Sequence, residues 1–402
     1  MGLNHTSHPV LATIDAAAIL ARTESWCAIN SGTSNLSGLA RMAHKLAEAF
    51  AALPGQIELV DPAPVTTIAP SGEQTEQPHG QHLVLRVRPD APRRVLLTGH
   101  MDTVYPPDHP FQAARWLDAE TLNAPAAADM KGGLAIMLEA LLAFERSPEA
   151  ATLGYDVMIN SDEETGSLAS AALIADLARG KLAALTYEPA TAPDGTLAHA
   201  RGGSGNYSVV AAGRSAHAGR NPQDGRNALL ALADLALRLK QLTHADLSVN
   251  PARIDGGSAN NVVPDHAVLR FNIRPRTVRA AEDFARSFAA LLADIAAAHE
   301  VTLTPHGGIT RPPKPVDARA QALFDLVQQA GADLGQHFGW RPSGGVCDGN
   351  NIAAVGVPVV DTMGARGGAI HSPEEYLIVP SLAERARLST LVLLRLATGA
   401  LA

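Results

Sequence analysis

The hydrophobic pattern of the first 60 residues predicts helices. Residues 14–28 are rich in alanine, and residues 36–53 repeat apolar side chains at steps of three and four until Pro54 and Gly55 end the pattern. A segment with proline and glutamine, residues 61–80, predicts a surface loop. Short apolar runs then alternate with helical patterns up to residue 187, which is typical of an α/β sheet covered by helices.

The pattern changes near residue 198, where a glycine-rich segment begins. It then predicts a helix, a strand, a second helix and a second strand over residues 227–242, 261–273, 280–299 and 301–304. This order predicts a small α+β insert with two helices on an antiparallel sheet. The alternation of strands and helices returns near residue 312. We therefore expect one domain from residues 1–198 and 311–402, and a second from residues 199–310.

Composition narrows the class of protein. The 402 residues are 46% hydrophobic and 18% charged, which describes a globular chain large enough for two cores and excludes disordered, collagenous and disulfide-rich scaffolds. The net charge of −8 comes without a block of Lys or Arg, so we expect small-molecule partners, with no nucleic acid and no membrane. Without a signal pattern or an apolar span, the predicted compartment is the cytoplasm.

Cysteine count limits the metal chemistry. Cys27 and Cys347 are too few for a disulfide framework and lack the CxxC spacing of a zinc site, so a bound metal would need histidine and carboxylate ligands. Candidates follow the apolar runs. His100 and Asp102 come directly after residues 95–97, and a carboxylate there can hold the imidazole while the other ring nitrogen binds metal. The alternative is a turn in which Asp102 caps a helix.

Further acids lie in similar positions. Asp129 precedes a long apolar helix and could be a simple N-cap. Three consecutive acids, residues 162–164, end another run, and such crowded charges are costly to bury unless a cation neutralises them; a solvated acidic turn is the alternative. Glu188 ends a third run, and His371 follows a glycine-rich loop.

Together these residues supply enough ligands for two tetrahedral zinc ions, if one carboxylate bridges and water completes the coordination. The five candidate ligands are His100, Asp129, Glu164, Glu188 and His371. Glu163 adjoins a ligand and is predicted to point elsewhere, because side chains alternate along a strand, which leaves it free to act as a base.

Five segments in this order, GHMDTVYP, ADMKGG, SDEETGS, YEP and GGAIHSPEE, resemble the M20 family of dinuclear zinc peptidases and amidohydrolases, especially its glutamate carboxypeptidase G2-like branch. The resemblance covers the chain from about residue 80. It implies a mixed-sheet α/β catalytic domain with an inserted α+β lid domain, in which two helices pack on a four-stranded antiparallel sheet. It also implies a homodimer formed through the lid.

The resemblance implies a role for each site residue. His100, Asp129 and Glu188 would hold one Zn²⁺, while Asp129, Glu164 and His371 would hold the second, with Co²⁺ or Mn²⁺ as alternatives. Asp102 would orient His100. Glu163 would be the general base, taking a proton from the metal-bridging water and passing it to the leaving nitrogen.

The resemblance also assigns the substrate contacts. His217 would reach the partner's active site and polarise the scissile carbonyl, although a histidine in a polar loop is more often a surface residue. Asn261 and Arg274 would bind the substrate carboxylate, and Gly367 and Gly368 would lend backbone N–H groups. A surface strand residue paired with a Glu is the alternative for Arg274.

The predicted function is a hydrolase that cleaves an amide or peptide bond by attack of a dizinc-bound water and releases a C-terminal amino acid. Glu188, where the aminopeptidases of the family have Asp, favours the carboxypeptidase and deacylase branches. An N-acyl amino acid deacylase, similar to acetylornithine deacetylase or succinyl-diaminopimelate desuccinylase, is the alternative. A further alternative is a non-catalytic metal- or peptide-binding protein on the same fold.

Two segments depart from the family pattern. Ala124 and Ala126 stand where members commonly have Gly, which predicts an altered backbone beside Asp129. Cys347 precedes Asp348, where relatives often have Thr or Ser. We expect Asp348 to support the site and Cys347 to be a buried thiol without a catalytic role.

Overall fold

The computed structural model describes residues 8–401, which divide into two compact units. The first unit contains the chain up to Ala63, the segment Pro78–Ala200 and the chain from Val316 onward. The second contains Pro64–Gln77 and Arg201–Pro315.

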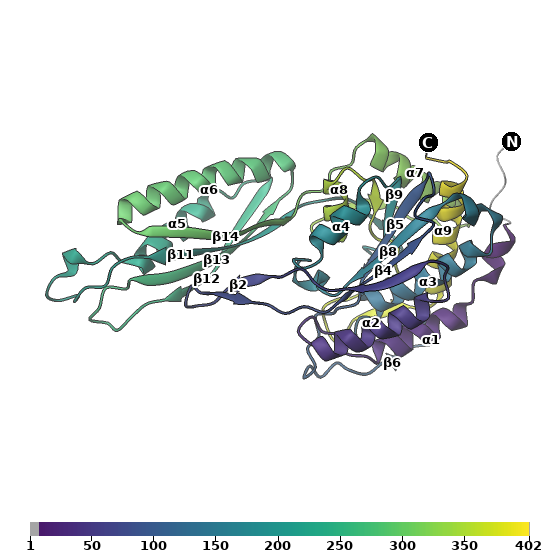
Figure 1. Cartoon of the computed structure of the whole chain (residues 1–402), viewed down its shortest axis with the longest axis horizontal. Helices are drawn as coiled ribbons and strands as arrows, with labels where there is room; N and C mark the ends of the chain where they lie inside the picture. The colour runs from purple at the N-terminus through teal and green to yellow at the C-terminus, as the bar shows by residue number, and fades with distance from the viewer. Residues whose placement is uncertain (1–7, 402) are drawn as a thin grey trace. The chain divides into compact units, whose positions relative to one another are not determined.

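The first unit is built on a six-stranded mixed sheet (Figure 1). In spatial order the strands are β1 (Gln56–Val60), β4 (His82–Val87), β8 (Gly154–Asn160), β5 (Arg94–His100), β9 (Ala183–Thr186) and β16 (Val359–Val360). The pairs β1/β4 and β4/β8 are antiparallel, whereas β8, β5, β9 and β16 run parallel to one another. The strands β5, β8 and β9 are almost continuously buried, as expected for a sheet covered on both faces.

Helices cover both faces of this sheet (Figure 1). Successive strand side chains point to opposite faces, so Leu96 and Met158 pack with α4 (Ala171–Ala178) and α8 (Asp348–Ala354). Their neighbours Leu97 and Val157 belong to the larger core on the other face. The helices of that core are α1 (Ala16–Cys27), α2 (Leu36–Phe50), α3 (Gly132–Glu145), α7 (Ala318–Asp333) and α9 (Pro380–Ala397).

Two smaller sheets complete the strand pairing around this unit. One has four strands in the order β17 (Gly367–Gly368), β18 (Tyr376–Ile378), β7 (Thr121–Asn123) and β6 (Arg115–Trp116). The other pairs β10 (Leu197–Arg201) with β15 (Trp340–Ser343). The four-stranded sheet joins segments that lie about 250 residues apart in sequence, because Tyr376 pairs with Asn123.

The second unit is an α+β layer of one sheet and two helices. Its antiparallel strands follow the order β12 (Leu247–Gly256), β13 (His266–Pro275), β11 (Ser204–Ala212) and β14 (Thr302–Arg311). Helices α5 (Ala228–Gln241) and α6 (Val278–His299) bury their apolar sides against one face. The predicted fold class is therefore confirmed, with a mixed-sheet α/β unit and a four-stranded antiparallel sheet carrying two helices.

Strand β12 and a hairpin within residues 61–80 differ from the sequence predictions. Strand β12 was not predicted because only alternate residues at its start are buried and the rest of the strand is polar or partly exposed. Residues 61–80, predicted as a surface loop of the first domain, contain a hairpin of β2 (Thr66–Ile68) and β3 (Gln74–Glu76) that groups with the second unit. Arg270 attaches this hairpin by donating a hydrogen bond to the Ile68 carbonyl at 2.7 Å.

Among the residues that the structure describes, no helix is both long enough and apolar enough to span a bilayer. Both cysteines, Cys27 and Cys347, are buried, and neither forms a disulfide with the other. Burial raises the pKa of the Cys27 thiol to about 12, which keeps this thiol protonated and unreactive at neutral pH.

Candidate metal centre

Three parallel strands of the first unit deliver polar side chains to one edge of the sheet. His100 is the last residue of β5, Glu163 opens a 3₁₀ turn (Glu163–Thr165) after β8, and Glu188 lies just past the end of β9. Because β8, β5 and β9 are parallel neighbours, their carboxyl ends lie side by side. Open α/β sheets place their ligand sites at this edge.

Two further residues reach this edge from turns. Asp129 lies in an irregular turn (Ala127–Lys131) and has non-helical backbone angles, φ −118° and ψ 88°. It is not the N-cap of α3, because that position is Lys131. His371 has a left-handed backbone with φ 62° and follows β17. Both positions are therefore irregular backbone fixed by the surrounding structure.

The five predicted ligands form one cluster, in which the Asp129 carboxylate contacts both histidines. Its Oδ1 lies 3.1 Å from His100 Nε2, and its Oδ2 lies 3.2 Å from His371 Nε2. His371 Nε2 is also 3.2 Å from Glu164 Oε2, and His100 Nε2 is 3.8 Å from Glu188 Oε2. The two oxygens of one carboxylate thus face two different imidazoles.

Charge crowding in this cluster follows from burial. The side chains of His100, Asp129 and Glu164 are 1%, 7% and 6% exposed. Burial and the neighbouring Asp129 charge raise the pKa of Glu164 to about 8. Burial alone would raise the pKa of Asp129 as well, but hydrogen bonds from His100 and His371 hold it well below its usual range. Hydrogen bonds to Asp129 and Glu164 raise the pKa of His371 to about 11.

These shifts mean that protons on imidazole and carboxylate offset the negative charge of the cluster when no cation is bound. Two imidazole nitrogens with several carboxylate oxygens are a donor set that zinc and other divalent first-row ions accept. Ligand atoms of His100, Asp129 and Glu164 lie within 4.8 Å of one another, as do those of His100, Glu163 and Glu188. The residues present therefore fit divalent metal ions.

Asp102 joins two parts of the site. The His100 Nδ1 atom lies 3.0 Å from the Asp102 backbone carbonyl and 3.4 Å from its carboxylate Oδ1. The same carboxylate accepts hydrogen bonds from the backbone N–H groups of Glu163 and Glu164 and from the Thr33 hydroxyl. Asp102 therefore fixes the imidazole, leaving Nε2 toward the cluster, and also holds the acidic turn beside it.

The position of Glu163 corrects one premise of the sequence prediction. Alternation along a strand was expected to turn this side chain away, but residues 163–165 form a 3₁₀ turn. Its carboxylate instead lies close to His100 and Glu188, and the side chain is buried. Glu163 and Glu164 therefore both face the cluster, from successive positions of the same turn.

A buried polar network supports this turn from behind. The Asp348 carboxylate accepts hydrogen bonds from Asn160 Nδ2 at 2.8 Å and from the Ser167 hydroxyl. Asp162 accepts hydrogen bonds from the backbone N–H of Ala169 and from the Ser170 hydroxyl. Asp348 thus contacts residues on both sides of the turn that carries Glu163 and Glu164, while Cys347 is the N-cap residue of α8.

The remaining predicted residues lie elsewhere in the fold. His217 and Asn261 are exposed neighbours in the second unit, where the Ala218 N–H donates to the Asn261 carbonyl at 2.9 Å. Arg274 is exposed on β13, and its Nε donates to the Asn272 side chain. Asn261 precedes β13, although the sequence predicted a strand from this residue.

Gly367 and Gly368 belong to the first unit and form β17, paired with β18 rather than lying in an open loop. The nearby Gly364 allows a close backbone approach, because a Cβ there would lie 2.2 Å from the Tyr187 carbonyl oxygen. The Gly364 N–H donates to the Glu188 carbonyl at 2.9 Å, so this glycine fixes the backbone of a predicted ligand.

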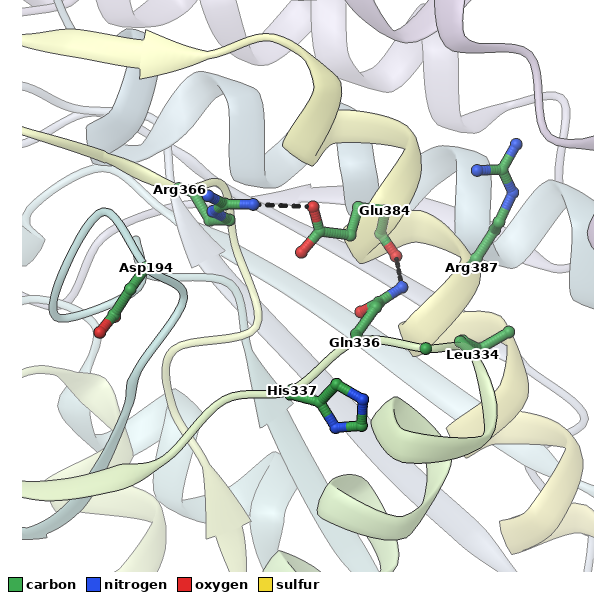
Figure 2. Close-up of a pocket in the computed structure, with 8 residues that line it drawn as sticks. Asp194, Leu334, Gln336, His337, Arg366, Glu384 and Arg387 are labelled. Carbon is green, nitrogen blue, oxygen red and sulfur yellow. Dashed lines mark hydrogen bonds and ion pairs between the residues drawn. The ribbon is translucent and has the colours of Figure 1, made fainter.

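A separate polar cavity of about 330 Å³ opens on the first unit (Figure 2). Its lining includes Arg366, which forms an ion pair with Glu384 at 3.0 Å, and Gln336, which donates to the Glu384 backbone carbonyl. None of the predicted ligands lines it. Arg366 and Glu384 pair with each other, whereas the metal cluster gathers buried histidine and acidic side chains, so the metal cluster is the stronger functional site.

Fold and cluster together agree with comparisons to known proteins. The family model for peptidase family M20/M25/M40 matches residues 96–395, so the chain belongs to this family. It is accordingly a metal-dependent peptidase or amidohydrolase with a candidate metal site.

Two curated relatives and one solved structure illustrate the similarity. Carboxypeptidase G2 of Pseudomonas sp. (strain RS-16) is 27% identical over 335 residues, covering 80% of this chain and 78% of the relative. A succinyl-diaminopimelate desuccinylase of Psychrobacter sp. (strain PRwf-1) is 27% identical over 332 residues, covering 76% and 80%. A tripeptidase from Staphylococcus aureus has the same fold, with a TM-score of 0.72, 22% identity and coverage of 96% and 99%.

Proposed function

We propose that the protein hydrolyses an amide or peptide bond and releases a C-terminal amino acid, in the manner of a glutamate carboxypeptidase. The observation that carries this proposal is the Asp129 carboxylate, whose two oxygens face His100 and His371 at 3.1 and 3.2 Å. A carboxylate in this position can bridge two metal ions. The similarity to carboxypeptidase G2 supports the carboxypeptidase reading.

In this proposal two ions, Zn²⁺ by preference, share Asp129. His100 and Glu188 would complete one ligand set, and Glu164 and His371 the other. Bound divalent ions of this kind polarise a carbonyl and lower the pKa of water, which supplies a nucleophile at neutral pH. Co²⁺ and Mn²⁺ accept similar ligands and are the alternatives to zinc.

Glu163 would act as the general base. Its carboxylate accepts a proton from the attacking water and then donates that proton to the leaving nitrogen. The Asp102 carboxylate holds the backbone of this turn through the N–H groups of Glu163 and Glu164, which keeps the base in place during both transfers. The buried location of Glu163 limits competing solvent.

The second unit would be the lid. His217 of one subunit would polarise the scissile carbonyl in the active site of its partner, and Asn261 and Arg274 would bind the free carboxylate of the substrate. Two facts support this assignment: all three side chains are exposed, and His217 and Asn261 are neighbours. Gly367 and Gly368 would add backbone N–H groups. This assignment requires a homodimer formed through the lid. We also propose the cytoplasm as the compartment.

A second candidate is an N-acyl amino acid deacylase, which the desuccinylase relative favours. The test is a substrate panel of N-acetyl, N-succinyl and N-benzoyl amino acids beside dipeptides, assayed with zinc and with a chelator. Zinc-dependent release of a C-terminal amino acid from peptides or benzoyl conjugates supports the carboxypeptidase. Preference for acetyl or succinyl groups supports the deacylase, and binding without cleavage of any compound would favour a non-catalytic binding protein.

A further inference from the structure

A buried acid, Glu375, contacts the turn that carries Asp129. Glu375 is 1% exposed, and its Oε1 accepts hydrogen bonds from the backbone N–H groups of Ala128 and Asp129, both at 3.0 Å. Its Oε2 accepts from the Ala126 N–H at 3.2 Å and from the Tyr105 hydroxyl at 2.8 Å. One carboxylate thus binds three backbone amides within four residues.

These bonds fix a backbone that its own sequence does not favour. Ala126 has a left-handed conformation with φ 59°, which residues with a side chain seldom adopt, and its own side chain does not cap the turn that follows. Asp129 itself departs from helical angles. One carboxylate that accepts hydrogen bonds from the amides on both sides of this bend stabilises it, because these buried N–H groups would otherwise lack an acceptor.

The same group reaches the segment that carries His371. The Tyr105 hydroxyl lies 2.9 Å from the Ser372 carbonyl as well as 2.8 Å from Glu375. The Glu375 N–H donates to the Ser372 carbonyl at 3.0 Å, and Asn123 Nδ2 donates to the Glu375 carbonyl at 2.6 Å. Glu375 therefore connects the turn of Asp129 with the residues that directly follow His371.

We propose that Glu375 is a positioning residue for the metal centre. Its carboxylate holds Asp129 and the segment after His371 in the arrangement in which the two face each other, before an ion binds. This inference rests on the proposed function only in treating Asp129 and His371 as metal ligands. It does not depend on which bond the enzyme cleaves.

The test compares Glu375→Gln with Glu374→Gln, a matched change at the exposed neighbouring acid. In E375Q an NH₂ group replaces one carboxylate oxygen. This NH₂ group is a hydrogen-bond donor and would face donors that the oxygen accepted from. We expect the dissociation constant for Co²⁺ to rise about 10- to 100-fold, as for other residues that support ligands, with an altered visible Co²⁺ spectrum. Amide hydrogen exchange at residues 126, 128 and 129 should accelerate in the metal-free protein. E374Q should change none of these readouts.

Unchanged Co²⁺ affinity and unchanged exchange in a folded E375Q would overturn the inference. If E375Q does not fold, the variant Tyr105→Phe tests the inference instead. It removes one hydrogen-bond donor to Glu375 and the contact with Ser372 without altering the backbone. Tyr105→Phe should also weaken Co²⁺ binding. Unchanged Co²⁺ affinity and unchanged amide hydrogen exchange in this variant would contradict the inference. Neither readout requires turnover, so a wild-type protein that binds Co²⁺ but cleaves no amide would refute the proposed function alone.

Discussion

At the scale of single residues, the position of Glu163 leads to a direct prediction. Glu163→Gln keeps the size of the side chain but cannot accept a proton, so turnover should fall by about 10²- to 10⁴-fold, the usual contribution of a general base. Metal content should stay close to that of the wild type, because the five predicted ligands are intact. Steady-state kinetics with metal analysis measures both quantities.

The control for this prediction is Glu48→Gln, a change of the same kind at a side chain that is 71% exposed on α2. It should leave turnover and metal content unchanged. A Glu163→Gln enzyme with near-normal kcat would remove Glu163 from the role of base.

A role could be predicted from the sequence for residues within a recognisable motif. It could not be predicted for residues whose partners are backbone groups. His100 and Glu188 could be proposed as ligands because acids and histidines directly after apolar runs are visible in the sequence, and the two side chains lie 3.8 Å apart in the structure. Glu375 was part of a quoted motif but received no role, since its partners are three backbone amides more than 240 residues away. Only its place four residues after His371 could have indicated it.

At the scale of elements, the close approach between Gly364 and the end of β9 makes a further prediction. A Cβ on residue 364 would lie 2.2 Å from the Tyr187 carbonyl oxygen and 2.7 Å from that of Glu188, and backbone atoms cannot swing aside. Gly364→Ala should therefore lower the free energy of unfolding by about 1–3 kcal/mol and weaken metal binding through Glu188. Denaturant unfolding and metal titration measure these effects.

Gly344→Ala is the matched control, because a Cβ at residue 344 meets nothing within 4 Å. It should change stability by less than about 0.5 kcal/mol, as most surface substitutions do. Equal stabilities of the two variants would show that the backbone beside Glu188 moves more freely than the contact implies.

Helices and strands were predictable where buried apolar residues form a clear pattern along the sequence. The buried strands β5, β8 and β9 and the apolar helix α3 lie in the stretch up to residue 187 where the sequence predicted strands alternating with helices. The hairpin of β2 and β3 was missed because its residues are mostly exposed and polar, so no alternation indicates a buried side. Its attachment by Arg270 is a tertiary contact that local sequence does not encode.

At the scale of the whole molecule, the proposed role of His217 requires a partner subunit. We predict that His217→Ala and Glu163→Gln are each inactive as homodimers. Mixed dimers would combine an intact base in one chain with an intact histidine in the other. Full exchange makes half of the dimers mixed, with one complete site each, so activity should return to about one quarter of the wild-type value.

Activity assays after unfolding and refolding of the mixture, with sedimentation analysis of its mass, make this measurement. The control is Glu163→Gln protein that is unfolded and refolded in the same way without His217→Ala. A monomeric protein, or a mixture that stays inactive while dimers exchange, would contradict action of His217 across subunits.

The central claim is that Asp129 joins two metal ions, and anomalous X-ray diffraction from crystals of the zinc-loaded protein tests it most directly. The account predicts two zinc peaks per chain, one beside His100 and Glu188 and one beside Glu164 and His371, with an Asp129 oxygen on each. A single peak, or peaks away from Asp129, would contradict it.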